Sequence, residues 1–96
     1  MSQQQQLIAI VYGYVQGVSF RYYTQRAARR LGVTGWVANQ RDGSVKVVAE
    51  GDKPVLQEFL AFLHEGSPAA RVQRVDVSWG EAAGTFQNFS IRLIDG

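Results

Sequence analysis

The chain has 96 residues, of which 46% are hydrophobic and 19% charged, with a formal net charge of +2. This length fits one small domain, since domains typically take about 100–200 residues. No apolar run approaches the ~18 residues of a membrane span, and the start lacks a signal-peptide pattern, so we expect a cytoplasmic protein with no membrane association. The sequence has no cysteine and only one histidine, His64. These absences exclude disulfides, thiol nucleophiles and histidine-cluster metal sites.

The first third of the chain predicts a tail, a strand and a helix. Residues 1–6 (MSQQQQ) are polar and aperiodic, which predicts a disordered N-terminal tail before a single domain over residues 7–96. Residues 7–14 (LIAIVYGY) are apolar on both faces and rich in β-branched and aromatic side chains, which favours a central strand. Over residues 20–31, apolar or small side chains recur every three or four positions, which predicts an amphipathic helix that ends at Gly32.

The rest of the chain predicts four further strands and a second helix. Residues 33–39 and 45–50 form two strands joined by a hairpin, for which the Asp42-Gly43 pair is a strong signal. Asp52 can cap a helix that buries Leu56, Phe59, Leu60 and Leu63 and ends near residues 66–68. Alternating side chains over residues 74–79 predict a fourth strand, and residues 89–94 predict a short fifth strand at an edge.

The predicted order β-α-β-β-α-β defines the fold class. Two β-α-β units joined by a tight hairpin give an α+β ferredoxin-like sandwich, in which two helices cover one face of an antiparallel sheet. The strands over residues 7–14 and 45–50 should be central, because both are apolar enough to lie inside a sheet.

The loop between the first strand and the first helix (Gly13 to Arg21, GYVQGVSFR) is a candidate anion site. A helix N-terminus presents unpaired backbone N–H groups, and glycine lets successive N–H groups converge on one anion. The alternative is a plain strand-to-helix turn with Ser19 as N-cap. Arg21 favours the anion site, because a cation in the first helical turn opposes the helix dipole by about 0.3–1 kcal/mol. A bound dianion would resolve this conflict.

Other polar residues have simpler explanations. Asn39 ends the second predicted strand, where Asn is favoured in turns, although its amide could also orient a water molecule. The basic helix face is typical of solvated surface. His64 near the end of the second helix has no neighbour in the sequence that would make it catalytic. The basic face consists of Arg26, Arg29 and Arg30.

Two segments together resemble the signatures of the acylphosphatase family. GYVQGVSFR at residues 13–21 resembles the family's phosphate-loop signature, and GWVANQRDGSVKVVAEG at residues 35–51 resembles its second signature. Each motif fixes many positions, and the likeness extends from Leu7 to Ile94. The family's ferredoxin-like order agrees with the strands and helices predicted above.

This resemblance implies hydrolysis of an acyl phosphate to a carboxylate and inorganic phosphate, without metal or cofactor. Arg21 would then bind the phosphoryl oxygens, and Asn39 would hold the attacking water in line with the leaving acyl oxygen. Backbone N–H groups of the loop would complete the phosphate cradle. The loop residues are Val15, Gln16, Gly17, Val18, Ser19 and Phe20.

The residues suffice for this chemistry. A carboxylate leaving group, with a conjugate-acid pKa of about 4, needs little help from a general acid. Phosphoryl transfer depends mostly on positioning and on charge stabilisation, so an Arg, an Asn and a set of amides are enough. Phosphate monoesters, with their much poorer alkoxide leaving groups, are not expected substrates.

Two other functions are compatible with parts of the sequence. Tyr12, Tyr14, Trp36 and an isoelectric point of about 9.3 would suit an RNA-binding module of the same fold, but residues 45–50 lack the aromatic-glycine pattern of such modules. An accessory domain that has lost catalysis is the other possibility. We expect a monomer whose partners are an acyl phosphate substrate and its phosphate product, and no nucleic acid.

Overall fold

The predicted alternation of strands and helices is present in a computed structural model, which describes residues 4–94. The described residues confirm the β-α-β-β-α-β order with a further strand at the C-terminal end. The elements are β1 (Gln4–Tyr14), α1 (Phe20–Leu31), β2 (Thr34–Asn39), β3 (Val45–Asp52), α2 (Lys53–Glu65), β4 (Arg71–Glu81) and β5 (Phe89–Ile94).

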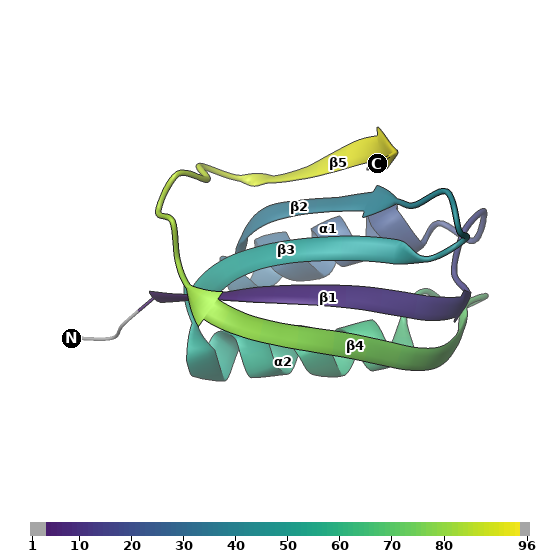
Figure 1. Cartoon of the computed structure of the whole chain (residues 1–96), viewed down its shortest axis with the longest axis horizontal. Coiled ribbons are helices and arrows are strands. Elements are labelled where there is room, and N and C mark those ends of the chain that lie inside the picture. The colour runs from purple at the N-terminus through teal and green to yellow at the C-terminus, as the bar shows by residue number, and fades with distance from the viewer. Residues whose placement is uncertain (1–3, 95–96) are drawn as a thin grey trace.

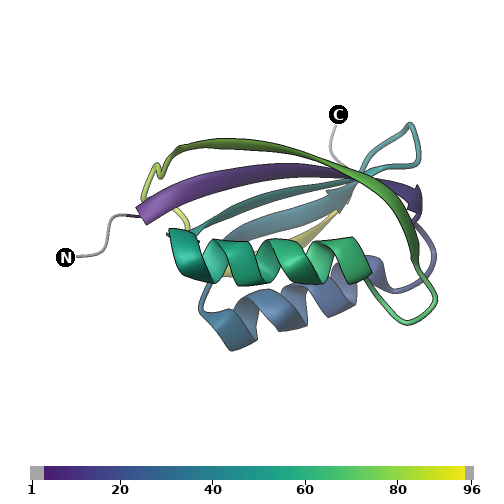
Figure 2. The same cartoon turned by 90° about the horizontal axis from the view of Figure 1, so that it is seen from below.

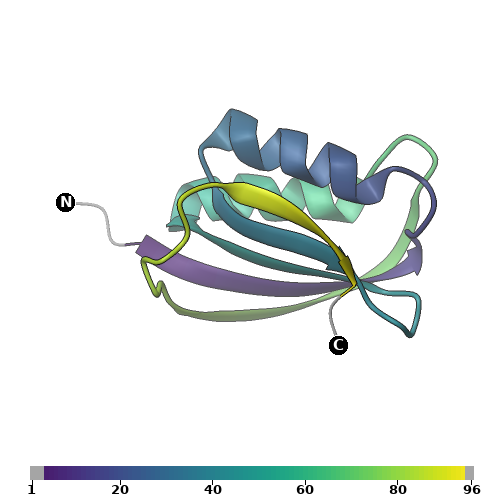
Figure 3. The ribbon, with the colours of Figure 1, turned by 90° about the horizontal axis from the view of Figure 1, so that it is seen from above.

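The strands form one sheet in the order β4-β1-β3-β2-β5, with β1 and β3 inside as predicted (Figure 1). Neighbouring strands run antiparallel except at the β5 edge, where β5 pairs with β2 in parallel. The sheet is therefore mixed, whereas the sequence predicted an antiparallel sheet. The reason is that β4 and β5 lie at opposite edges, so the chain crosses one end of the sheet and returns in the direction of β2 (Figure 3).

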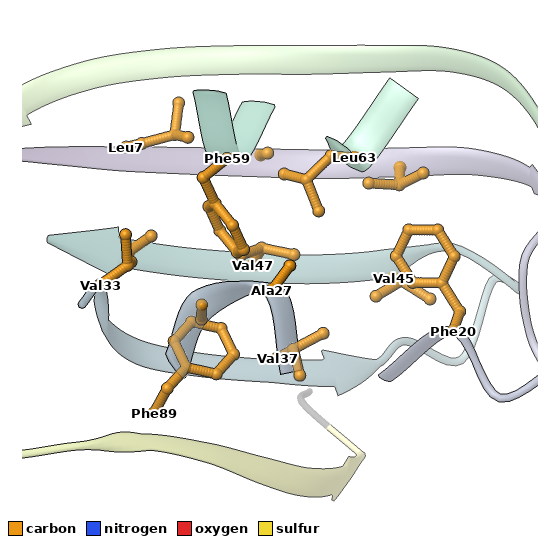
Figure 4. Close-up of a cluster of buried hydrophobic side chains, with 14 of the residues drawn as sticks. Leu7, Phe20, Ala27, Val33, Val37, Val45, Val47, Phe59, Leu63 and Phe89 are labelled. Atoms are coloured by element: carbon orange, nitrogen blue, oxygen red, sulfur yellow. The ribbon is translucent and has the colours of Figure 1, made fainter. Parts of the chain in front are cut away.

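Both helices cover the same face of the sheet (Figure 2). The period-two alternation of β1 directs Leu7, Ala9 and Val11 toward them, and all three are fully buried. Figure 4 shows Phe20 and Ala27 of α1, and Phe59 and Leu63 of α2, meeting the buried valines of β2 and β3. This contact between layers fixes where α1 begins, and hence where the loop before it lies.

The prediction of a disordered tail was wrong for residues 4–6, which belong to β1; residues 1–3, like residues 95–96 of the predicted domain, lie outside the described residues. These glutamines pair with residues 50–52 of β3. Gln4 Nε2 donates to Asp52 Oδ1 at 2.9 Å, and Gln6 Nε2 donates to Glu50 Oε2 at 2.8 Å. Polar residues thus extend the strand because their amides have acceptors across the ladder. Asp52 occupies the N-cap position of α2 but makes no side-chain cap bond.

Glu50 fixes the crossover between β4 and β5. Its side chain is only 3% exposed, on the sheet face away from the helices. Its carboxylate accepts hydrogen bonds from the backbone N–H groups of Ala83 (2.8 Å) and Gly84 (3.1 Å). Burial alone would raise the pKa of Glu50, but the hydrogen bonds from Ala83, Gln6 and Gly84 outweigh it and leave the pKa below its usual value.

We predict that Glu50→Gln lowers the free energy of unfolding by about 1–3 kcal/mol at neutral pH, because an NH₂ group would face a backbone N–H donor. The depressed pKa means that the wild-type carboxylate stabilises the fold above its unfolded pKa of about 4.3, and that this contribution is lost as pH falls through the folded pKa. Urea unfolding at several pH values checks both statements. Glu58→Gln, at an exposed carboxylate of α2, is the control and should change little. An equal loss of stability at pH 3 and pH 7 would contradict the assignment.

Candidate active site

Three segments far apart in the sequence meet at one end of the molecule. The loop after β1, the β2–β3 hairpin and the end of β5 lie together at the right of Figure 1. Between them is a pocket of about 360 Å³ that brings together Arg21 and Asn39, the two residues singled out from the sequence. The residues that line it are Val15, Gly17, Ser19, Phe20, Arg21, Tyr22, Asn39 and Ile91.

A glycine bulge directs the chain from β1 into this loop. The β1–β4 register shifts between Tyr12 and Gly13, and Gly13 has a φ of 131°. A Cβ at this position would lie 2.1 Å from the carbonyl oxygen of Arg71, so no residue with a side chain fits without moving the backbone. The bulge thus sets where the loop leaves the sheet.

The loop backbone alternates between positive and negative φ. Gly17 has a φ of 74° and Ser19 a φ of 60°, and Ser19 is the only non-glycine residue with positive φ within residues 4–94. Val18 between them therefore has negative φ. Alternating backbone of this kind is typical of nests, in which successive N–H groups point toward one concave side that binds an anion. Ser19 stands at the N-cap position of α1, as the capping alternative predicts, but its side chain makes no cap hydrogen bond.

Hydrogen bonds and buried side chains hold the loop on both sides. Gln16 Nε2 donates to the backbone oxygens of Gln40 (2.7 Å) and Ser44 (2.8 Å), tying the loop to the hairpin. Ser67 Oγ donates to the carbonyl oxygen of Val18 at 2.7 Å, from the turn after α2. Val15 and Phe20, at the two ends of the loop, are 1% and 2% exposed and belong to the core. The loop is thus preformed, which favours ligand binding because little order remains to be imposed.

Arg21 extends from the first turn of α1 toward β5. Its Nη1 donates to the carbonyl oxygens of Arg92 (2.7 Å) and Leu93 (3.2 Å). No ion pair joins it to a carboxylate among residues 4–94, and the first turn of α1 holds no acidic residue. The guanidinium is therefore held in one orientation, and no carboxylate within residues 4–94 neutralises its charge.

Asn39 enters the pocket from the end of β2. In the β2 pleat it lies on the same side as Val37, the side that faces the helices, and it is half-buried. Its side-chain amide has no hydrogen-bond partner within residues 4–94, so its donors and acceptor remain available. The adjacent hairpin is held by Asp42, whose carboxylate accepts from the backbone N–H of Ser44 at 2.9 Å. The Ser44 hydroxyl and this N–H lower the pKa of Asp42, so it stays ionised near neutrality.

Six of the eight predicted site residues line the pocket, and the other two position the loop. Gln16 acts through its contacts with the hairpin, and Val18 through its carbonyl. Ser67 and the β5 carbonyls also contact the site residues, and neither was predicted from the sequence. A glycine-serine-proline turn and a backbone group of an edge strand carry no local signal, since their role comes from the tertiary fold.

The remaining polar features lie elsewhere. Arg26 and Arg30 border a separate hollow of about 470 Å³ between the helices, next to Tyr23 and Phe62. His64 is exposed on α2. In the part of the chain that the structure describes, no three His, Asp or Glu side chains cluster as metal ligands do. No helix within residues 4–94 has the length and apolar composition needed to span a membrane.

The chain is similar to known proteins in both sequence and fold. Residues 7–91 match the acylphosphatase family. The acylphosphatase of Salinibacter ruber is 48% identical over 89 residues, covering 93% of this chain and 94% of that protein. The acylphosphatase of Thermus thermophilus is 50% identical over 78 residues, covering 81% and 89%. The crystal structure of the Bacillus subtilis acylphosphatase superposes with a TM-score of 0.89 at 39% identity, covering 92% of this chain and 98% of that one. The chain belongs to the acylphosphatase family and is a hydrolase that acts on acyl phosphates.

Proposed function

We propose that this chain cleaves the carboxyl-phosphate bond with a phosphate cradle formed by residues 15–20, with Arg21 as the phosphoryl-binding cation and with Asn39 as the residue that positions water. One observation carries the proposal. Arg21, Asn39 and the loop line the same pocket, with the Arg21 charge unpaired and the Asn39 amide unoccupied among the described residues.

The phosphoryl group would lie at the N-terminus of α1. There the loop N–H groups, the positive end of the helix dipole and the guanidinium all favour a dianion. Arg21 uses Nη1 to reach the β5 carbonyls, which leaves its other N–H donors for phosphoryl oxygens. The guanidinium is thus held in place by one nitrogen and binds substrate with the rest of its fork.

Asn39 would hold the attacking water through its amide oxygen. The water oxygen attacks phosphorus while the bond from phosphorus to the acyl oxygen breaks, and the electron pair of that bond leaves with the carboxylate. The water proton passes to a phosphoryl oxygen, so one acyl phosphate dianion and one water give a carboxylate and a phosphate monoanion. No side chain has to act as general base, since an amide orients water without accepting its proton.

The sheet face away from the helices supports this function over RNA binding. The Arg74 guanidinium lies 4.2 Å from the Tyr12 ring centroid, and the Arg92 guanidinium lies 4.2 Å from that of Trp36. Trp36 is also only 8% exposed. An RNA base could stack on these rings only by displacing the cations and uncovering the tryptophan. All residues of the proposed site come from one chain, which is consistent with a monomer. A cytoplasmic location remains our prediction.

The reaction itself is tested by hydrolysis of a chromogenic aryl acyl phosphate by the purified chain. We expect metal-independent turnover that persists in excess chelator, because no ligand cluster is present among residues 4–94. Absence of hydrolysis by folded protein would favour the accessory-domain alternative. Inactivation by chelator that added Mg²⁺ reverses would contradict the proposed mechanism.

Replacing Arg21 should remove both binding and turnover. We predict that Arg21→Ala lowers kcat/KM by at least about 10²-fold, the scale of losing one preorganised charge stabiliser, and weakens inhibition by inorganic phosphate. Steady-state kinetics with phosphate as competitive inhibitor measure both effects. Arg29→Ala, at an exposed arginine of the same helix, is the matched control. Unchanged phosphate affinity in Arg21→Ala would remove this residue from the site.

Replacing Asn39 should separate turnover from binding. Asn39→Ala is expected to lower kcat by about 10²-fold or more, because the water loses its orienting group, while the phosphate cradle is intact. Phosphate inhibition should therefore match the wild type. If phosphate affinity falls in parallel with turnover, Asn39 is a direct phosphate ligand or a structural residue.

A further inference from the structure

One buried hydroxyl contacts the loop before α1 from outside the pocket. Ser67 belongs to the turn after α2, which lies at the same end of the molecule as the loop (Figure 2), and its side chain is 3% exposed. Its Oγ donates to the carbonyl oxygen of Val18 at 2.7 Å. Gly17 and Ser19 line the pocket, whereas Val18 and Ser67 are not among its lining residues. The hydroxyl therefore holds the loop from the side away from the pocket.

The backbone that bears Ser67 is itself held in place. Gly66 ends α2 with a φ of 75°, and its N–H donates to the carbonyl oxygen of Phe62 at 2.8 Å. A Cβ at Gly66 would lie 2.7 Å from the Phe20 ring, so only glycine lets the turn lie this close to the start of α1. The carbonyl oxygen of Ser67 accepts from the N–H of Ala70 at 3.0 Å, which closes the turn.

The contact fixes the orientation of one peptide group in the loop. A trans peptide group is planar, and its C=O and N–H point in opposite directions. Because the carbonyl of Val18 points to Ser67, the N–H of Ser19 in the same peptide group points away from Ser67. One hydrogen bond outside the pocket thus determines which end of this peptide group lies on the pocket side.

Backbone strain favours the opposite orientation. Ser19 has a φ of 60°, which a residue with a side chain adopts only at a cost in free energy. Rotation of the peptide group between Val18 and Ser19 by about half a turn would give Ser19 a negative φ and relieve this cost. The loop therefore needs a contact that opposes the rotation.

We propose that Ser67 is a positioning residue that keeps the carbonyl of Val18 out of the phosphate cradle and the N–H of Ser19 directed into it. This inference rests on the proposed function, since it assumes that phosphate binds at residues 15–20. An N–H at that place attracts a dianion, whereas a carbonyl oxygen would repel it.

The hydroxyl of Ser67 distinguishes the two orientations through its proton. In the rotated peptide group, Oγ can accept from the N–H of Ser19, but the hydroxyl proton loses its acceptor, the carbonyl of Val18. A buried donor without an acceptor costs free energy, so the hydroxyl favours the orientation that is present. In Ser67→Ala, one backbone group faces the alanine unpaired in either orientation. The strain at Ser19 then decides the balance in favour of rotation.

The first test measures phosphate binding by Ser67→Ala. We expect the inhibition constant of inorganic phosphate and the KM for a chromogenic aryl acyl phosphate to rise by about 3- to 10-fold, the scale of one hydrogen bond. The kcat should fall less, because the cradle binds the phosphoryl group in the ground state and in the transition state. Ser78→Ala, at an exposed serine of β4, is the matched control and should behave as wild type.

A second substitution separates positioning from a merely structural role. Glycine adopts positive φ readily, so Ser19→Gly removes the strain that favours rotation. Ser67→Ala should therefore weaken phosphate binding less in the Ser19→Gly background than in wild type, with the two effects differing by about 2-fold or more. A structural role for Ser67 predicts the same loss in both backgrounds.

Amide NMR spectra observe the peptide group directly. When wild type is titrated with inorganic phosphate, the amide proton of Ser19 should move downfield as it donates to the anion, and in Ser67→Ala this shift should be smaller. If Ser67→Ala does not fold, Ser67→Cys replaces it in each measurement, because a thiol of similar size is only a weak donor.

The outcomes separate this inference from the proposed function. If phosphate shifts no amide of residues 15–20 in folded wild-type protein, the proposed cradle fails. If these amides respond and Ser67→Ala keeps both the inhibition constant and the Ser19 shift of wild type, the cradle stands and the role of Ser67 is overturned. An equal loss of phosphate binding in the wild-type and Ser19→Gly backgrounds would also overturn it.

Discussion

Unbalanced positive charge at the N-terminus of α1 is the constraint to which the rest of the site responds. Arg21 lies in the first helical turn, where the helix dipole already opposes a cation and where no acidic residue offsets it. Its partners in the described structure are the β5 carbonyls, which orient the guanidinium but carry only partial charge. The site therefore remains electropositive, and a dianion entering it meets aligned dipoles that need no reorganisation.

Such an arrangement persists only if the surrounding structure enforces it. The left-handed backbone of Ser19 costs free energy of order 1 kcal/mol or more, and the loop would relax if it were free. It is held instead by Gln16 and Ser67 on its two sides, and by Val15 and Phe20 in the core. The same core that stabilises the fold thus supports the strain of the loop. This coupling explains how a small sheet-and-helix sandwich can hold the loop in the conformation that we propose binds phosphate.

Most of the fold could be predicted because its signals are local. Period-two and period-3.6 patterns, the Asp42-Gly43 turn and the Gly32 stop each report on a few adjacent residues, and the structure confirms the elements that they predict. The errors came from pairings across the sheet. Gln4–Gln6 become strand because β3 and β4 are there to pair with them, and the parallel direction of β5 follows from the edge at which β4 lies.

The candidate site shows the same division. Arg21 and the loop were recognisable because a cation, two glycines and a helix start are adjacent in the sequence. Asn39 was recognisable only weakly from its own position, since its proximity to Arg21 depends on how β2 aligns with α1 across the core. The anchoring contacts of Arg21 and Val18 involve backbone carbonyls, which are the same for every residue type. No sequence pattern could therefore have indicated them.

The small number of reactive groups at this site determines how it can discriminate between substrates. In the proposed mechanism, an arginine, an asparagine and backbone amides stabilise the transferring phosphoryl group but provide no strong acid for the leaving oxygen, so only phosphates with a good leaving group should react. Selection for the anhydride thus comes from the chemistry of the bond itself. Selection among acyl groups has to come from contacts beyond the phosphoryl group. Tyr22 follows Arg21 in α1, and Ile91 precedes Arg92, whose carbonyl oxygen accepts from Arg21, so the apolar lining of the pocket and the guanidinium are held by the same two elements.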